Sequence, residues 1–488
     1  MRYLNYIGGR WIEASGGKSF ANVNPATGEE IGRFPSSDAR DAAQAVLAAE
    51  SSFGSWSRMP VPERGKILRR FAELLSDHRE EIARIETLEM GKILSESIGD
   101  VQEGVDTAEY AAGEGVRFFG RTAPSALPDK ACLTFRKPFG VAALITPWNF
   151  PAAIPCWKLM PALLAGNTVV LKPSRESPCT AEKLVELLAA AGVPEGVVNL
   201  VQGSGSVAGK ALCEDPGVSV ISFTGSTAAG AEIARIGGGL LKKVSLELGG
   251  KNGQIVMDDA DLELALEGAL QGAFGTTGQR CTAASRLILH KGIHDEFLSM
   301  LVDRAGKIKI GSGLDEETRM GPLISEAQRE KVHGYVESGK KEGARLECGG
   351  EFYTENGCGR GFFYKPTIFS NAAPGMKIAQ EEIFGPVLSV FRAGGLEEAL
   401  DVINGVGYGL SASIYTRDVN AAMRAVREIE AGVVNINSST IGAESHLPFG
   451  GVKKSGNGHA EGGWAAYDIF SREETVFIDY SGRLQKAD

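Results

Sequence analysis

A cysteine and a glutamate stand in two short segments whose residue types could support nucleophilic chemistry. Cys281 lies in the segment FGTTGQRCTAASR, residues 274–286, and Glu247 lies upstream in LELGGKN, residues 246–252. A thiol is a strong nucleophile only as its thiolate, and an enzyme that forms a thioester also needs a group that activates water to break it. The two segments therefore predict Cys281 as a nucleophile and Glu247 as a general base.

Each candidate residue, taken alone, also has a structural explanation. A single cysteine is most often a small buried hydrophobic residue, and a single glutamate is most often a solvated charge. Asn149, which precedes Phe-Pro, could be a turn residue whose side chain bonds the backbone. The segments around these residues decide between the two interpretations.

Four further motifs complete a pattern that spans the chain. They are PWNFP at 147–151, LKPS at 171–174, FTGS at 223–226 and EEIFGP at 381–386. With the segments of Glu247 and Cys281, they closely resemble the aldehyde dehydrogenase superfamily. The resemblance extends from YIGGRW at 6–11 to PFGGVKKSG at 448–456. It implies an NAD(P)-dependent, non-acylating aldehyde dehydrogenase, similar to the semialdehyde dehydrogenases.

The resemblance assigns a role to each member of the predicted catalytic set, which is Cys281, Glu247, Asn149 and Lys172. Cys281 attacks the aldehyde carbon, and the Asn149 amide with the Cys281 backbone N–H stabilises the oxyanion. Hydride transfer to NAD(P)+ then leaves a thioester. Water activated by Glu247 hydrolyses the thioester to the carboxylic acid.

The family's motifs also imply a set of cofactor-binding residues. Ser226 is favoured over the GSGSVAG segment at 203–209, because glycine patterns alone are weak evidence and a helix starting after Ser226 would present N–H groups to the pyrophosphate. Lys172 is expected at the adenine-side ribose, and Glu382 at the nicotinamide ribose with Phe384 beside it. The full set is Trp148, Lys172, Ser174, Arg175, Gly225, Ser226, Leu248, Glu382 and Phe384.

One position departs from the NAD-preferring pattern. Those relatives often carry a glutamate three residues after the lysine of the LKPS motif, where this chain has Arg175. A cation there favours a 2′-phosphate, so the sequence leans towards NADP. The alternative is that Glu176 makes the contact to the ribose of NAD and that Arg175 is a surface charge.

The substrate class is indicated by three groups of residues. The segment GQRCTAASR resembles semialdehyde dehydrogenases that act on oxo-acids more than the succinic semialdehyde group. By family position, an apolar tunnel for aliphatic or aromatic aldehydes is expected from Phe150, Trp157 and Phe449. Glu103 and Asp106 are expected near the tunnel mouth, where they could attract an amine-bearing aldehyde or form an ordinary solvated helix face.

The elements that must position these residues form two α/β series. Helical periodicity covers 38–118, and short buried-type strands alternate with helices from residue 140 and again after Cys281, which predicts parallel sheets. The expected fold is a Rossmann-like cofactor domain (1–118 and 139–249, rejoined by about 449–467) with an α/β catalytic domain (250–448). Extended segments at 119–138 and 468–488 are expected to form an oligomerisation arm.

Composition excludes several classes of partner. The 488 residues have a formal net charge of −10 and no run of basic residues, which argues against nucleic acid and anionic membranes as partners. The seven cysteines include no CxxC pair, so free thiols are expected and no metal site is. With no signal-peptide pattern, the sequence predicts a cytoplasmic homodimer or homotetramer that acts on a small aldehyde.

Three other functions remain open from the sequence. A CoA-acylating dehydrogenase would pass the thioester to a thiol, although such enzymes tend to lack the base that Glu247 provides. A hydrolase or transferase could use the same thiol without redox chemistry, although the Lys172, Ser226 and Glu382 motifs argue for a nicotinamide cofactor. A non-catalytic structural or binding protein of the same fold is the third.

Overall fold

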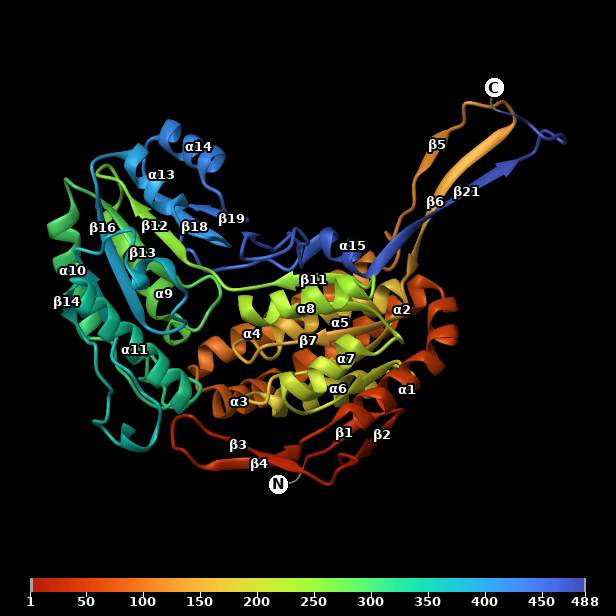
Figure 1. Ribbon diagram of the computed structural model, residues 1–488, viewed down its shortest axis with the longest axis horizontal. Coiled ribbons are helices and arrows are strands. Elements are labelled where there is room, and N and C mark those ends of the chain that lie inside the picture. The colour runs from red at the N-terminus through yellow and green to blue at the C-terminus, as the bar shows by residue number, and fades with distance from the viewer. Residues whose placement is uncertain (1–2, 487–488) are drawn as a thin grey trace.

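A computed structural model describes residues 3–486 (Figure 1). Its first sheet has seven strands in the order β11-β10-β7-β8-β9-β1-β2. The five strands from β11 to β9 are parallel, as predicted, and β1 and β2 add an antiparallel edge. The strands are β1 (Asn5–Ile7), β2 (Arg10–Ile12), β7 (Val141–Ile145), β8 (Thr168–Lys172), β9 (Val198–Leu200), β10 (Val218–Thr224) and β11 (Lys243–Glu247).

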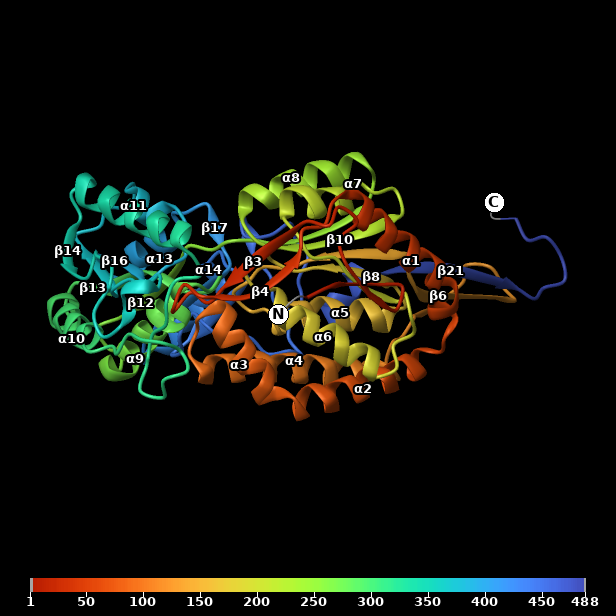
Figure 2. The ribbon, with the colours of Figure 1, turned by 90° about the horizontal axis from the view of Figure 1, so that it is seen from below.

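Helices cover both faces of this sheet, which is why β7 and β8 are buried at every position. Alternate residues of β7 pack on opposite layers: Ala142 and Leu144 lie in one core cluster, whereas Ala143 and Ile145 lie in another. The helices that follow the strands of this sheet are α5 (Ala153–Ala165), α6 (Pro178–Ala190), α7 (Lys210–Glu214) and α8 (Thr227–Gly239). Figure 2 shows α7 and α8 on one side of the sheet and α5 and α6 on the other.

The helical periodicity of residues 38–118 is confirmed as four helices: α1 (Ala39–Arg58), α2 (Val61–Asp77), α3 (Arg79–Met90) and α4 (Leu94–Glu114). Asp38 forms a capping box with Asp41 at the start of α1, and Pro62 lies in the first turn of α2, where no backbone N–H is needed. Helix α4 packs on α2 and α5, and its Asp100 is buried.

The second predicted α/β series is a separate seven-stranded sheet in the order β14-β15-β16-β13-β12-β18-β19, parallel except at β14. Its strands are β12 (Asn252–Val256), β13 (Ala284–His290), β14 (Arg345–Cys348), β15 (Thr367–Ser370), β16 (Val387–Ala393), β18 (Ser411–Tyr415) and β19 (Val433–Ile436). Its helices are α9 (Leu262–Phe274), α10 (His294–Gly306), α11 (Glu326–Glu342), α12 (Lys377–Gln380), α13 (Leu396–Asn404) and α14 (Val419–Glu428).

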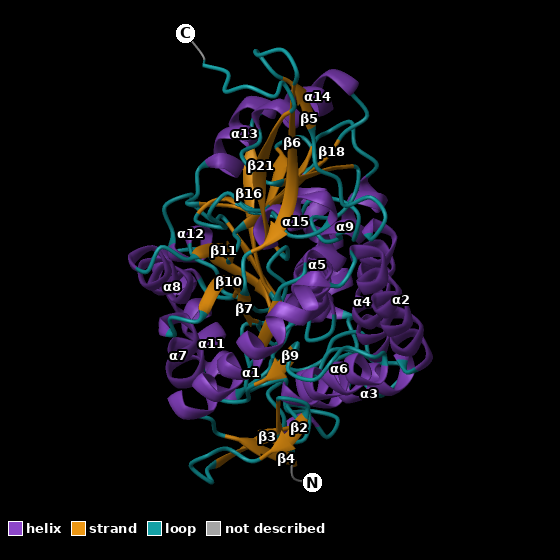
Figure 3. Cartoon of the chain, turned by 90° about the vertical axis from the view of Figure 1, so that its right-hand side faces the viewer, coloured by secondary structure: helices purple, strands orange, loops and turns teal. Residues whose placement is uncertain are grey.

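Three antiparallel strands project from the body of the molecule (Figures 1 and 3). They are β5 (Thr122–Pro124), β6 (Lys130–Pro138) and β21 (Ser471–Asp479). The second extended segment begins later than the predicted residue 468, because α15 (Ala466–Phe470) is a buried helical turn that packs on α5. Two small antiparallel pairs of strands remain, the hairpin of β3 (Ser19–Val23) with β4 (Glu30–Pro35) and the long-range pair of β17 (Tyr408–Gly409) with β20 (Val452–Lys453).

A segment near the C-terminal end of the chain lies against the end of β11. The Leu248 N–H donates to Ser455 O, and Gly456 bridges to Glu247 at the end of β11. Within residues 3–486, no helix is both long and apolar enough to cross a membrane. All seven cysteines are free thiols, as predicted.

Candidate active site

The predicted catalytic and cofactor residues gather at one edge of the first sheet. Glu247 is the last residue of β11, Lys172 is the last residue of β8, and the Asn149 loop follows β7 directly. Parallel strands place their carboxyl ends at the same edge, and ligands of such sheets bind there. Motifs that are far apart in the sequence therefore lie close together in the structure.

Cys281 reaches this edge from the second sheet, on a sharp turn between α9 and β13. Thr276 and Thr277 in this turn have φ angles of 51° and 58°, in the left-handed region. Gly278 also has a positive φ, and a Cβ there would lie 2.3 Å from Gly385 O, so only glycine fits. The turn immediately before Cys281 is thus held in one conformation.

Two cavities meet at Cys281. The first has a volume of about 290 Å³ and is lined by Glu247, Arg280, Phe150, Trp157 and Phe449 among others. The second, of about 180 Å³, contains Asn149, Ser226 and Glu382. Cys281 lines both, so a molecule in either cavity lies next to the same sulfur atom.

The thiol of Cys281 is not ionised by its surroundings. Burial, with the nearby carboxyl groups of Glu382 and Glu247, raises its pKa to about 12. The group is therefore a neutral thiol near pH 7, and its proton has to leave as the sulfur attacks.

Asn149 is buried beside this sulfur. Its Nδ2 donates to Gln279 O at 3.1 Å, two residues before the nucleophile. One N–H of the amide is used by this bond, and an amide carries two. The second N–H is free to serve an oxygen in the cavity that Asn149 and Cys281 share.

Glu247 is 3% exposed, and neither of its carboxylate oxygens has a hydrogen-bond partner among the described residues. Burial and the charge of Glu461 raise its pKa well above the ordinary value, against the opposing charge of Lys158. A carboxylate with a raised pKa is a stronger base, which suits proton abstraction from water.

Lys158 and Glu461 are not among the site residues predicted from the sequence. Lys158 Nζ contacts Glu461 Oε1 and donates to Ser222 Oγ at 2.9 Å, and Glu461 lines the first cavity with Glu247. A signal was present: Lys158 is the one charged residue in the apolar helix α5, AIPCWKLMPALLA. A lone charge in a fully buried helix requires a buried partner.

Six of the nine predicted cofactor residues line the second cavity: Trp148, Gly225, Ser226, Leu248, Glu382 and Phe384. Ser226 is the N-cap of α8, as predicted, so this helix presents its first N–H groups at the cavity. Glu382 accepts from Gly250 N at 2.9 Å. Phe384 has a φ of 59°, and its ring meets Trp148 edge-on at 5.4 Å.

These residues fit a nicotinamide dinucleotide. The N-terminus of α8 suits a pyrophosphate, and the Glu382 carboxylate suits ribose hydroxyls. Sequence reasoning missed Gln328 and Lys331, which line the same cavity. Gln328 Nε2 donates to Ile383 O and to Phe384 O, at 3.1 and 2.7 Å, and so holds the loop that carries Phe384.

Lys172, Ser174 and Arg175 line neither cavity and form a separate group beyond β8. Burial lowers the pKa of Lys172 to about 8, although Glu176 opposes this, and its Nζ donates to Pro173 O at 2.6 Å. The structure therefore does not bring Lys172 to Cys281 with the other predicted catalytic residues. Ser174 Oγ contacts Glu176, and the Arg175 guanidinium lies 4.5 Å from the centre of the Phe20 ring.

The predicted tunnel residues do line the first cavity, where the rings of Trp157 and Phe449 are 5.0 Å apart. Glu103 lines it too and accepts from Trp157 Nε1 at 3.2 Å, while Asp106 lies in a hollow outside. Burial raises the pKa of Glu103 to about 7. The first cavity thus combines aromatic walls with several carboxyl groups, which are those of Glu96, Asp100, Glu103, Glu247 and Glu461.

Comparison with known proteins gives one consistent result. Residues 11–476 match the Aldehyde dehydrogenase family. Alpha-ketoglutaric semialdehyde dehydrogenase of Bacillus subtilis is 44% identical over 98% of both chains, and 2,5-dioxopentanoate dehydrogenase of Saccharolobus solfataricus is 42% identical over 98% of this chain and 99% of its own. The crystal structure of betaine aldehyde dehydrogenase from Staphylococcus aureus with NAD+ has a TM-score of 0.97, 36% identity and covers 99% and 96% of the two chains. The chain belongs to the aldehyde dehydrogenase family, whose members oxidise aldehydes with NAD(P)+.

Proposed function

We propose that this protein oxidises an oxo-acid semialdehyde to the corresponding acid through a thioester on Cys281. The observation that carries the proposal is the position of Cys281 between two cavities, one apolar and one with the donor set of a nicotinamide site. A single sulfur can then bind the aldehyde carbon while the carbon faces the cofactor.

The first half of the reaction forms the thioester. Cys281 attacks the aldehyde carbon, and the free N–H of Asn149 with the Cys281 backbone N–H stabilises the oxyanion. Because the thiol has a raised pKa, its proton has to leave as the sulfur attacks, and water that enters the cavity can accept it. Ser226 at the N-terminus of α8 and the Glu382 carboxylate would hold NAD(P)+ in the second cavity, where it would supply the acceptor for the hydride of the tetrahedral adduct.

The second half of the reaction hydrolyses the thioester. Glu247 takes a proton from water, and its lack of hydrogen-bond partners in the described chain leaves both oxygens available for this. Glu461, held by Lys158 and Ser222, lines the same cavity, and its charge raises the pKa of Glu247. The proton taken up by Glu247 then leaves to water in this cavity. No thiol acceptor is required, which separates this reaction from that of a CoA-acylating enzyme.

The test of this function is formation of NAD(P)H by purified protein with oxo-acid, aliphatic, aromatic and amino aldehydes, each with NAD+ and with NADP+. Oxidation without added CoA supports the proposal. Oxidation only when CoA is added would support the acylating reaction instead, and no reaction under any condition would leave a non-catalytic role.

Arg280 supports the oxo-acid class. Among the described residues, Arg280 is the cation that lines the first cavity, and it directly precedes Cys281 in the chain. Its guanidinium lies 5.1 Å from the centre of the Phe150 ring. It is held by Glu96 at 3.3 Å and by Thr276 Oγ1 at 2.8 Å. These contacts leave further N–H donors of its fork for a substrate carboxylate. The names of the Bacillus and Saccharolobus relatives agree with this class.

We expect Arg280→Gln to lower kcat/KM for an oxo-acid semialdehyde by about 10- to 100-fold, because a charge-assisted hydrogen bond contributes about 1.5–3 kcal/mol. A neutral aliphatic aldehyde of equal length should lose much less, since it has no carboxylate to bind. Steady-state kinetics with both aldehydes measure the ratio. An equal loss for the two aldehydes would contradict the carboxylate contact.

An amine-bearing aldehyde is the second candidate, favoured by Glu103 at the outer end of the cavity and by the likeness to betaine aldehyde dehydrogenases. Arg280 opposes it by like-charge repulsion in the same cavity. A higher kcat/KM for a cationic aldehyde than for the oxo-acid, lost in Glu103→Gln, would replace the first candidate with this one.

Choice of cofactor depends on two neighbouring side chains of opposite charge. Arg175 supports NADP, as the sequence predicts, but it lies over Phe20, whereas Glu176 contacts Ser174 and attracts Lys172. We expect Arg175→Ala to lower the NADP/NAD ratio of kcat/KM, and Glu176→Gln to raise it, each by roughly tenfold. A wild-type preference for NAD would contradict the NADP expectation.

Division into domains and assembly follow from the same fold. We propose the first sheet as the cofactor domain, the second sheet as the catalytic domain, and β5, β6 and β21 as an arm that pairs subunits.

The arm carries exposed Phe135, Phe477 and Ile478, which are costly to leave in water. Sedimentation should give a dimer or tetramer, and a species of only 51.6 kDa would contradict it. A cytoplasmic location agrees with seven free thiols.

A further inference from the structure

We propose that Lys92, paired with the carboxylate of Asp100, is a positioning residue that fixes the Asn149 amide for the oxyanion. The inference rests on the proposed function, because it concerns the stabilisation of the adduct on Cys281. Nothing in the reaction described above uses this cluster, although all three of its charged groups are buried.

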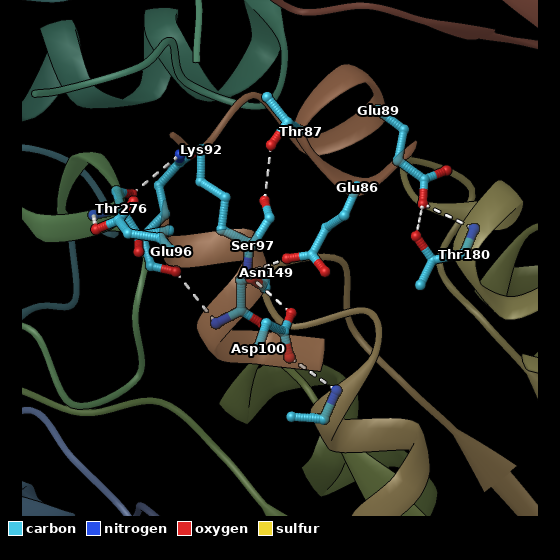
Figure 4. A network of polar contacts seen from close by, with 12 residues as sticks. Glu86, Thr87, Glu89, Lys92, Glu96, Ser97, Asp100, Asn149, Thr180 and Thr276 are labelled. Carbon is cyan, nitrogen blue, oxygen red and sulfur yellow. Dashed lines mark hydrogen bonds and ion pairs between the residues drawn. The ribbon is translucent and has the colours of Figure 1, made fainter. Parts of the chain in front are cut away.

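The contacts of Lys92 converge on the Asn149 loop (Figure 4). Lys92 lies between α3 and α4, and it is 1% exposed. Its Nζ contacts Glu86 Oε1 and lies 2.9 Å from Asp100 Oδ2 and 3.0 Å from Asn149 O. The same ammonium lies 4.2 Å from the centre of the Phe150 ring. It therefore binds the loop both by the carbonyl of Asn149 and by the following side chain.

Asp100 holds the other end of this loop. Its Oδ1 accepts from Ala153 N at 2.7 Å, at the first residue of α5, while Oδ2 faces Lys92. The backbone is thus fixed on both sides of the turn that carries Asn149. On the opposite side of that turn, Asn149 Nδ2 donates to Gln279 O. With its peptide held by Lys92, the amide has one direction in which to point its free N–H.

Lys92 is itself held in place by its backbone. Gly91 has a φ of 90°, and a Cβ there would lie 2.6 Å from Pro322 Cγ. Leu94 N donates to Gly313 O at 2.9 Å. The turn from α3 to α4 therefore rests against the loop that contains residues 313–322, and a lysine in it cannot drift from its target.

The charges of the cluster balance. Burial and the charge of Asp100 raise the pKa of Glu86 well above the ordinary value, which keeps this carboxyl neutral. The charged groups of the cluster are then the ammonium of Lys92 and the carboxylate of Asp100. A buried ion pair contributes little stability compared with apolar side chains of the same volume. A role in orienting the site accounts for its presence better than a role in stability.

A double-mutant cycle of Lys92→Met and Asn149→Ala tests the inference. We expect Lys92→Met to lower kcat by about 10- to 100-fold with little change in KM, because small misplacements of catalytic groups have effects of this size. In the Asn149→Ala background the same change should cost almost nothing further, since the group that it positions is gone. Equal losses in the two backgrounds would overturn the inference.

Alkylation of Cys281 by iodoacetamide separates positioning from structural damage. This reaction uses the thiol but forms no oxyanion, so its rate should not change in Lys92→Met while aldehyde oxidation falls. A parallel loss of both rates would show general damage to the site and overturn the inference. If Asn149→Ala has the kcat of the wild type, the oxyanion assignment of the proposed function fails as well.

Two further variants keep the test decisive. If Lys92→Met does not fold, Lys92→Met/Asp100→Asn removes both charges and retains an acceptor for Ala153 N, and it should show the same kcat loss. Glu89→Gln is the matched control. Glu89 is a buried acid of α3, the helix that carries Glu86, but it accepts from Cys179 N and Thr180 N instead of contacting Lys92. It should change stability and leave kcat as it is, and a kcat loss equal to that of Lys92→Met would overturn the inference.

Discussion

Replacing Cys281 by alanine is expected to lower kcat for aldehyde oxidation by about 10⁴-fold or more. Loss of a nucleophile removes the covalent route entirely, and effects of this order are usual for such residues. Because Cys281 alone lines both cavities with a thiol, no other group of the described chain can form the thioester at that place. The initial rate of NAD(P)H formation with an oxo-acid semialdehyde measures the loss.

Cys348→Ala is the matched control. Cys348 is a partly buried free cysteine at the end of β14, and its thiol faces Pro366 O rather than a cavity. The control variant should keep the wild-type rate. If the two variants lost activity equally, the loss would reflect thiol chemistry outside the site, and the assignment of the nucleophile would be wrong.

Replacing Glu247 by glutamine is expected to leave thioester formation and remove its hydrolysis. Each active site should release one equivalent of NAD(P)H in a burst, after which turnover should fall by about 10²- to 10⁴-fold, the usual contribution of a general base. Rapid-mixing measurements separate the burst from the slow phase. Added hydroxylamine should restore turnover, because it attacks the thioester without a base.

The pH dependence gives a second test of the same residue. The pKa of Glu247 is raised, so its base form is lost as pH falls through that raised value, and hydrolysis should speed up as pH rises across it. Glu247→Gln should lose this dependence. Glu103→Gln should keep it, which matters because burial raises the pKa of Glu103 too, to about 7, so that both carboxyl groups titrate above their ordinary range. A wild-type profile that is flat across this range, or one that is altered by Glu103→Gln alone, would contradict the role of Glu247.

The positions of many site residues could be predicted from the sequence because they depend on short local motifs. A buried strand that ends in a short motif places that motif at the carboxyl edge of a parallel sheet, and this rule positions Asn149, Ser226 and Glu247 correctly relative to one another. The same locality explains the correct helices from 39 to 114 and the N-cap at Ser226. Cys281 needed its flanking motif as well, since a cysteine alone carries no such signal.

Other features arise only from contacts between distant segments. Lys158 and Glu461 are 303 residues apart and meet behind Glu247, and Lys92 meets Asn149 across 57 residues. Sequence patterns report which residues are buried, but they do not report which buried charge faces which. Lys172 shows the converse: its motif was recognised, yet its side chain turns towards Pro173 and away from Cys281.

The sequence by itself thus determined the family and the two α/β series, and it predicted the nucleophile and base, because strand, helix and turn patterns follow from neighbouring residues. Only the tertiary structure decided that Cys281 joins two cavities, that its thiol and the carboxyl of Glu247 have raised pKa values, and that a second buried lysine holds the Asn149 loop. Burial and electrostatic fields are sums over side chains from the whole chain, so they exist only once the chain has folded.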